Sequence, residues 1–203
     1  MTTRISITHE LPDAAPETYV AFCAACAERL GAVYRLLSDP DEREWFDDLL
    51  DLGWRAAAGE DVDEECVDIL ESTDLEAAMG EDQAEQSFYT GQALALALNT
   101  LAVHLRLDMN KVELSGQTTQ SLLSDFDFEL AGATPRTTAF GEQPPPPGPL
   151  QALEIEEQQE FLRRATAGIP LDLNELRDAA RRTSERIAEA LPALADRKGW
   201  ELS

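Results

Sequence analysis

Basic side chains are scarce in this chain. Its 203 residues carry 16 lysines and arginines against 40 aspartates and glutamates, which gives a net charge of −24. A nucleic-acid binder needs cationic side chains to neutralise phosphates, and an anionic membrane surface repels an acidic protein. We therefore expect neither nucleic acid nor a membrane among the partners.

Cysteine and histidine are also rare. The odd set Cys23, Cys26 and Cys66 fits a reducing compartment better than a disulfide scaffold. Cys23 and Cys26 have the spacing of a redox motif, but they lie within a helical apolar stripe, which favours buried, unreactive thiols. His9 and His104 are isolated in sequence. We expect no zinc site, no other metal and no cofactor.

The sequence has no long apolar run. Its most apolar stretch, residues 93–107, is too short to span a membrane and is interrupted by Asn99, His104 and Arg106. Residues 1–12 lack the basic segment and apolar run of a signal peptide. These features indicate a soluble, cytoplasmic protein.

The acidic residues are concentrated in one segment. Residues 39–85 hold 19 acidic and 2 basic side chains, a net charge of −17. Such a block costs stability through self-repulsion, and it is either a solvated surface without a partner or a docking surface for a basic partner. The candidate partner-binding residues are Asp47, Asp48, Asp51, Asp61, Asp63, Glu64 and Asp68.

Helical periodicity dominates the remaining sequence, and only residues 4–9 alternate as a strand would. Pro16 and Pro40 suit the first position of a helix, and Asp172 with Glu175 forms a capping box. We expect helices over about residues 16–37, 40–59, 62–71, 84–107, 110–131, 150–167 and from 172 to beyond 194.

These helices predict an all-α fold, a single bundle-like domain of about seven helices. The helix at 84–107 is apolar nearly all round, which is typical of a central buried helix. Residues 1–15 are expected to form an N-terminal extension and 16–131 the helical core. Residues 132–149, which include four consecutive prolines, form a stiff linker, and 150–203 form a helical pair that packs on the same core.

No motif for catalysis is present. The Glu-x-x-His pairs of di-iron bundles are absent, and the alternating Asp61, Asp63 and Glu65 lack the glycine of a calcium loop, since Cys66 stands at its sixth position. An alternative to a docking protein is a small-molecule-binding protein or an enzyme. Its pocket would lie along the apolar helix, near Tyr89, Asn99 and His104.

The first helix resembles that of the YjaG-like family of small bacterial proteins, which carries a pattern of the type F-x-A-x-x-x-E-R-x-x-x-x-Y. Phe22, Ala24, Glu28, Arg29 and Tyr34 match it approximately. A tryptophan-bearing second helix, an acidic connector and a small-residue-rich central helix follow in the same order. The resemblance implies an all-α fold and brings no activity. The proline run and the heavier acidic block depart from the family pattern.

The sequence therefore favours a non-catalytic interaction protein. Its acidic segment, residues 39–85, would bind a basic protein, as an immunity or inhibitor protein does, with fast and salt-sensitive association. The pocket hypothesis stays open beside it. A third interpretation needs no partner: the acidity, with 14 arginines and only 2 lysines, is shared by the whole proteome of the source.

Overall fold

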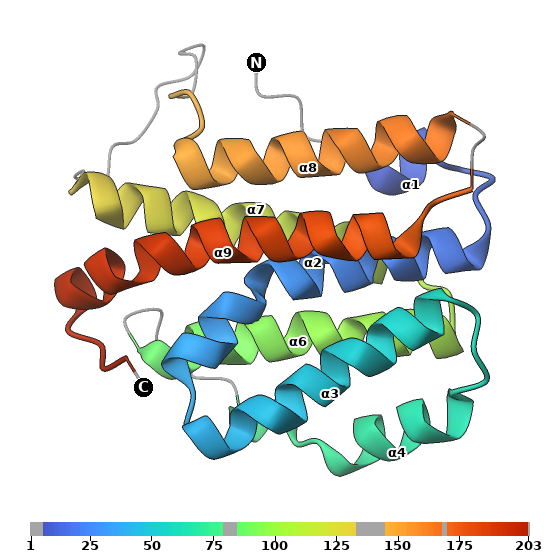
Figure 1. Cartoon of the computed structure of the whole chain (residues 1–203), viewed down its shortest axis with the longest axis horizontal. Coiled ribbons are helices and arrows are strands. Elements are labelled where there is room, and N and C mark those ends of the chain that lie inside the picture. The colour runs from blue at the N-terminus through green and yellow to red at the C-terminus, as the bar shows by residue number, and fades with distance from the viewer. Residues whose placement is uncertain (1–5, 79–84, 133–144, 168–169, 203) are drawn as a thin grey trace.

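The chain folds as a single all-α bundle (Figure 1). The structure is a computed structural model that describes residues 6–78, 85–132, 145–167 and 170–202, and those residues contain no strand. The helices are α1 (Ile7–Glu10), α2 (Pro16–Leu37), α3 (Pro40–Ala57), α4 (Asp63–Ser72), α5 (Leu75–Ala78), α6 (Gln86–Leu105), α7 (Met109–Ala131), α8 (Pro149–Thr166) and α9 (Leu173–Lys198). The seven expected helices are all present, each within a few residues of its expected ends.

Local signals set the helix starts as the sequence predicts. Pro16, Pro40 and Pro149 occupy the first turns of α2, α3 and α8, where a missing N–H costs nothing. The side chain of Asp172 accepts hydrogen bonds from the backbone N–H groups of Asn174 and Glu175 and so caps α9.

The central helix of the bundle is α2. Every residue from Tyr19 to Tyr34 is buried, and α2 packs chiefly against α6, α9 and α3. Helix α6, which the sequence placed at the centre, is largely buried, but Ala95 and Ala102 on its outer side stay partly exposed. The many alanines of α2 let neighbours approach from every side.

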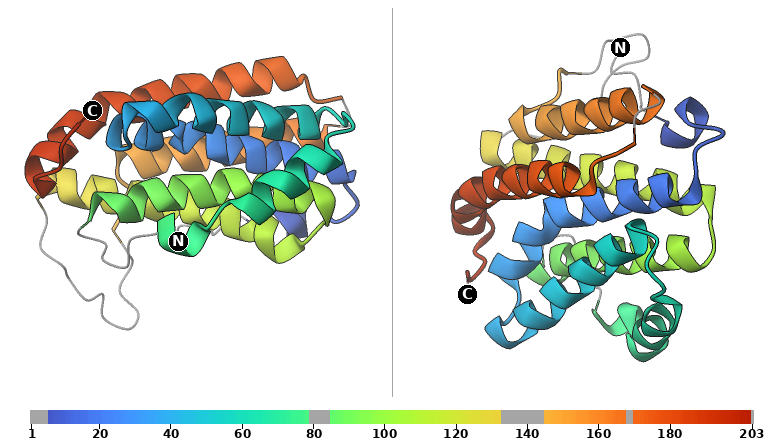
Figure 2. Two further views of the ribbon diagram at one scale, coloured as in Figure 1. Left: turned by 90° about the horizontal axis from the view of Figure 1, so that it is seen from below. Right: turned by 45° about the vertical axis from the view of Figure 1, so that its right-hand side comes forward.

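The two ends of the chain both join the core. Ile7 and Leu11 of the expected N-terminal extension are buried, and α1 packs against α7 instead of continuing the strand-like alternation. Helices α8 and α9 pack on α7 and α2, respectively (Figure 2). Residues 133–144 of the expected linker lie outside the described residues, and Pro145–Pro147 have no regular secondary structure.

Within the described segments, no helix has both the length and the apolar character that a membrane crossing requires.

Candidate functional site

The predicted acidic residues all lie at the surface of α3, α4 and the connector between them. They fall into two groups. Asp47, Asp51 and Asp63 have cationic or imidazole partners inside the protein: Arg35, Arg177 and His104, respectively. The other four, which form no ion pair with any described residue, are Asp48, Asp61, Glu64 and Asp68.

We use the name outer acidic face for the exposed carboxylates of α3 and α4 that form no ion pair within the described residues. Its members are Asp41, Glu42, Glu44 and Asp48 on α3, and Glu64, Asp68 and Glu71 on α4. The two helices make up the lower part of the molecule in Figure 1. Repulsion among these carboxylates is not offset inside the described fold, which is the electrostatic condition expected of a surface that receives a cationic partner.

Two apolar side chains lie among these carboxylates. Trp45 of α3 retains 36% of its surface and Val67 of α4 retains 39%. Trp45 follows Asp41 by four residues and precedes Asp48 by three, so all three project from one side of the helix. Trp45 is not among the candidate residues that the sequence predicts, although its position outside the Phe46–Leu49–Leu50 stripe is a signal for its exposure.

A buried carboxylate on α2 explains why part of the acidic segment is paired. The side chain of Glu28 is fully buried. It accepts hydrogen bonds from Trp54 Nε1 at 2.9 Å and Arg177 Nε at 3.2 Å. Arg35 and Arg181 each lie 3.5 Å from it. The charge of Glu28 is thus compensated by three arginines from two helices, as a buried charge requires.

The same arginines reach outward to α3. Arg35 Nε donates to Asp47 at 2.7 Å, and Arg177 Nη2 donates to Asp51. Arg177 also lies over the ring of Trp54 at 5.9 Å. This network holds α3 beside α9, so Asp47 and Asp51 serve the fold and are less available to a partner than the sequence suggested.

A second buried ion pair joins α2 to α8. Arg29 donates from Nε and Nη2 to Glu154 at 2.6 and 2.8 Å, and both side chains are essentially without solvent contact. Burial by itself lowers the pKa of Arg29, but the adjacent Glu154 charge outweighs it and raises the pKa above the ordinary value. Glu28 and Arg29 therefore both make interhelical ion pairs, and both are buried.

The structure does not bring Tyr89, Asn99 and His104 together. Tyr89 donates its hydroxyl to Asp125 and receives a hydrogen bond from Lys198 at 3.0 Å. Asn99 donates to the Lys111 carbonyl and to Ser115 of α7. His104 Nε2 lies 3.0 Å from Asp63 of α4. Tyr89 and Asn99 link α6 to different parts of α7, whereas His104 links it to α4, and of the three residues only Asn99 lines either of the two cavities between α6 and α7.

The cysteine thiols are enclosed and weakly acidic. All three are free and buried. Burial raises the pKa of Cys23 to about 12 and that of Cys66 to about 11, and it also raises the pKa of Cys26. The sequence-based interpretation of the Cys23–Cys26 pair as buried small side chains is confirmed.

Metal ligation finds no support among the described residues, where no group of three histidine, cysteine or carboxylate side chains is placed to hold an ion. The comparisons with known proteins add no functional information: no family model, no curated protein and no solved structure matches the chain. The resemblance of α2 to the YjaG-like pattern stays a prediction.

Proposed function

We propose that this protein is a non-catalytic interaction module that binds a basic partner through its outer acidic face. The observation that carries the proposal is the position of Trp45, an exposed tryptophan between the carboxylates Asp41 and Asp48 on α3. An immunity or inhibitor protein that neutralises a cationic surface is the kind of protein that this arrangement suits.

The chemistry of the face supports an arginine- or lysine-bearing partner. Tryptophan is enriched among the side chains that dominate binding energy, and its ring face attracts a guanidinium or ammonium group. Asp41 and Asp48 flank that ring and can each receive a charge-assisted hydrogen bond. A cation that docks here therefore meets both an apolar surface and the opposite charge.

The ion pairs within the protein indicate which carboxylates are available to a partner. Because Asp47 and Asp51 are engaged by Arg35 and Arg177, a partner gains less from them than from Asp48. The proposed site, the outer acidic face, therefore contains Asp48, Glu64 and Asp68 of the seven sequence candidates. It adds Asp41, Glu42, Glu44 and Glu71, together with Trp45.

Affinity capture with matched charge variants tests the proposal. The immobilised protein is exposed to an extract of its source cells and eluted with increasing salt. The test variant carries Asp41→Asn, Glu44→Gln and Asp48→Asn. The control variant carries the same number of neutralisations at exposed carboxylates of other helices: Glu156→Gln, Asp178→Asn and Asp196→Asn.

The proposal expects a basic protein that elutes from the native and control proteins only at high salt and is lost from the test variant, because screening weakens exposed charge pairs. Equal loss from both variants would show that only the net charge matters. Capture of no basic protein would contradict the proposal.

A further inference from the structure

Helix α7 presents a stripe of exposed and partly exposed side chains that the proposed function does not use. Lys111, Leu114, Thr118, Ser121 and Asp125 follow one another at spacings of three and four, which places them on one side of the helix. Leu114 is 56% exposed and is the most exposed large apolar side chain of the described residues. A leucine so placed on a helix stripe indicates a contact surface.

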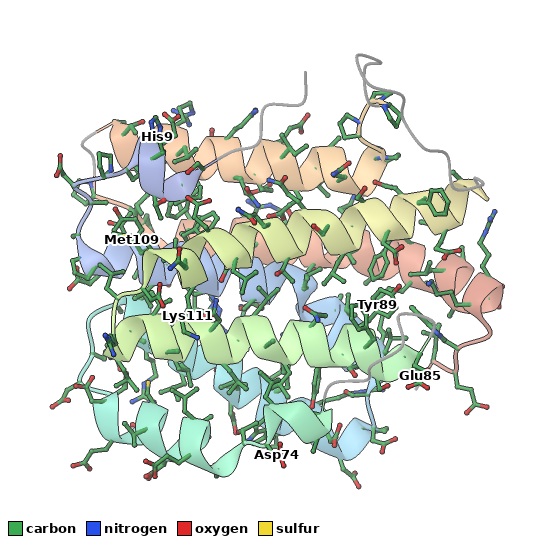
Figure 3. All side chains as sticks on the ribbon, turned by 180° about the vertical axis from the view of Figure 1, so that it is seen from behind. His9, Asp74, Glu85, Tyr89, Met109 and Lys111 are labelled. Carbon is green, nitrogen blue, oxygen red and sulfur yellow. The ribbon has the colours of Figure 1, made fainter. Side chains whose placement is uncertain are left out.

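Two cavities border this stripe, where α7 lies beside α6. The first, of about 460 Å³, is lined by Phe88, Leu122 and Asp125 among others. The second, of about 350 Å³, includes Ala95 and Ala102. Both share Gln92, Leu114 and Thr118, so they form one hollow along the two helices. Figure 3 shows α6 and α7 side by side on this side of the molecule, with Lys111 toward one end and Tyr89 toward the other.

Charge distinguishes this surface from the remainder of the protein. Among all residues that line the two cavities, the charged ones are Lys111 and Asp125, of opposite sign and at opposite ends. The side chains between them are apolar or carry amides and hydroxyls. A copy of a protein with a net charge of −24 is repelled by most of the acidic surface, for example by the outer acidic face, whereas the charges that line this hollow sum to zero.

We infer that this surface is the interface of a symmetric homodimer, in which two α7 helices pack antiparallel about a two-fold axis at Thr118. In that register, residues equally distant from Thr118 face each other. Lys111 then faces Asp125 of the partner subunit, and Leu114 faces Leu122 of the partner subunit. A two-fold interface must be complementary to itself, and the pairing of Lys111 with Asp125 makes this stripe so in charge.

In this arrangement the Leu114 side chain of each copy lies next to a cavity of the other copy. Leu122 lines the larger cavity together with Phe88 and Asp125, so the Leu114 side chain of one copy enters the cavity of the other. The stripe from Lys111 to Asp125 is about 21 Å long at the helical rise per residue, and each of the two copies contributes one such stripe to the interface. The inference rests on the surface of α6 and α7 and does not depend on the proposed function.

Sedimentation velocity over a wide range of protein concentration tests the dimer. The native protein shifts from monomer to dimer as concentration rises, and added salt strengthens the dimer because it screens the repulsion between the two acidic copies. Leu114→Asp raises the dissociation constant by about tenfold or more, since it removes two buried leucines per dimer. The matched control Leu202→Asp, at a side chain that is 40% exposed, leaves the equilibrium unchanged.

A cysteine at the axis tests the register. Thr118→Cys places two thiols within disulfide distance of each other only if the axis passes through that residue, and the three native thiols are buried. Oxidised glutathione then converts this variant to a covalent dimer much faster than it converts Thr166→Cys, an exposed position on α8. A monomer at every concentration and salt, a dimer that survives Leu114→Asp, or equal cross-linking of the two cysteine variants would each overturn the inference.

Discussion

Neutralisation of Glu154 will destabilise the fold far more than the loss of a surface ion pair. The Glu154 carboxylate is fully buried and accepts two hydrogen bonds from Arg29 and one from Gln158 at 2.7 Å. Glu154→Gln keeps the size of the side chain but leaves the guanidinium of Arg29 buried without a counter-charge. Breaking a buried pair in this way costs about 3–5 kcal/mol.

Urea denaturation and thermal denaturation, both followed by circular dichroism, measure that cost. For a protein of this size, 1 kcal/mol shifts the melting temperature by about 2–4 °C, so the melting temperature of Glu154→Gln should fall by roughly 6–20 °C. The matched control is Glu160→Gln on the same helix. Glu160 is partly exposed and pairs with Arg163 and Arg164, and its loss should cost about 1 kcal/mol or less.

A double variant separates lost charge compensation from lost packing. Arg29→Met with Glu154→Met removes both charges, and Gln158 keeps its other acceptor, the Gly116 carbonyl at 3.0 Å. Replacing both partners of a buried pair by apolar groups is often neutral, so the double variant should be more stable than Glu154→Gln. A cost below about 1 kcal/mol for Glu154→Gln would refute the reasoning, because it would mean that the pair behaves like an exposed one.

Three further predictions concern packing, capping and pH. Gly116→Ala should cost about 1–3 kcal/mol in urea denaturation, because the added Cβ would lie 3.0 Å from the ring of the buried Phe22. Asp172→Ala should cost about 1 kcal/mol by loss of the α9 cap, whereas Asp172→Asn should retain most of the stability. Burial raises the pKa values of Cys23 and Cys66 from 9.0 to about 12 and about 11, so their stabilising contribution is complete below pH 9 and is lost as the pH rises through the folded values. The urea midpoint should therefore fall with rising pH in that range, and less steeply in Cys66→Ala; a fall of equal slope in both proteins would contradict the assignment to Cys66.

The helices were predictable because their signals are local. Prolines at first turns, the Asp172 cap and the three-and-four spacing of apolar residues act within one or two helical turns, so the sequence alone locates the ends of α2, α3 and α9. Which helix lies at the centre of the bundle could not be predicted from such local signals. Helix α2 is central because alanine leaves room on all sides, which a hydrophobic stripe does not reveal.

The candidate site was predictable only in part. The sequence located the acidic segment, but it could not divide paired from unpaired carboxylates, because the partners of Asp47 and Asp51 lie on α2 and α9. Arg177 is 126 residues from Asp51 in the chain. The fully buried Glu28 was beyond a pattern-based analysis for the same reason: its three arginine partners become neighbours only in the folded bundle.

The affinity of the outer acidic face for a cation tests the central claim most directly. A fluorescently labelled oligo-arginine peptide is titrated with the native protein, with Trp45→Ala and with a control, Val67→Ala, at low and high salt. Salt is expected to weaken binding to all three proteins. At each salt concentration, Trp45→Ala should lose about 30-fold more affinity than the control, since truncation of a central aromatic contact costs about 2 kcal/mol. Equal affinity of the native protein and Trp45→Ala at both salt concentrations would contradict the account.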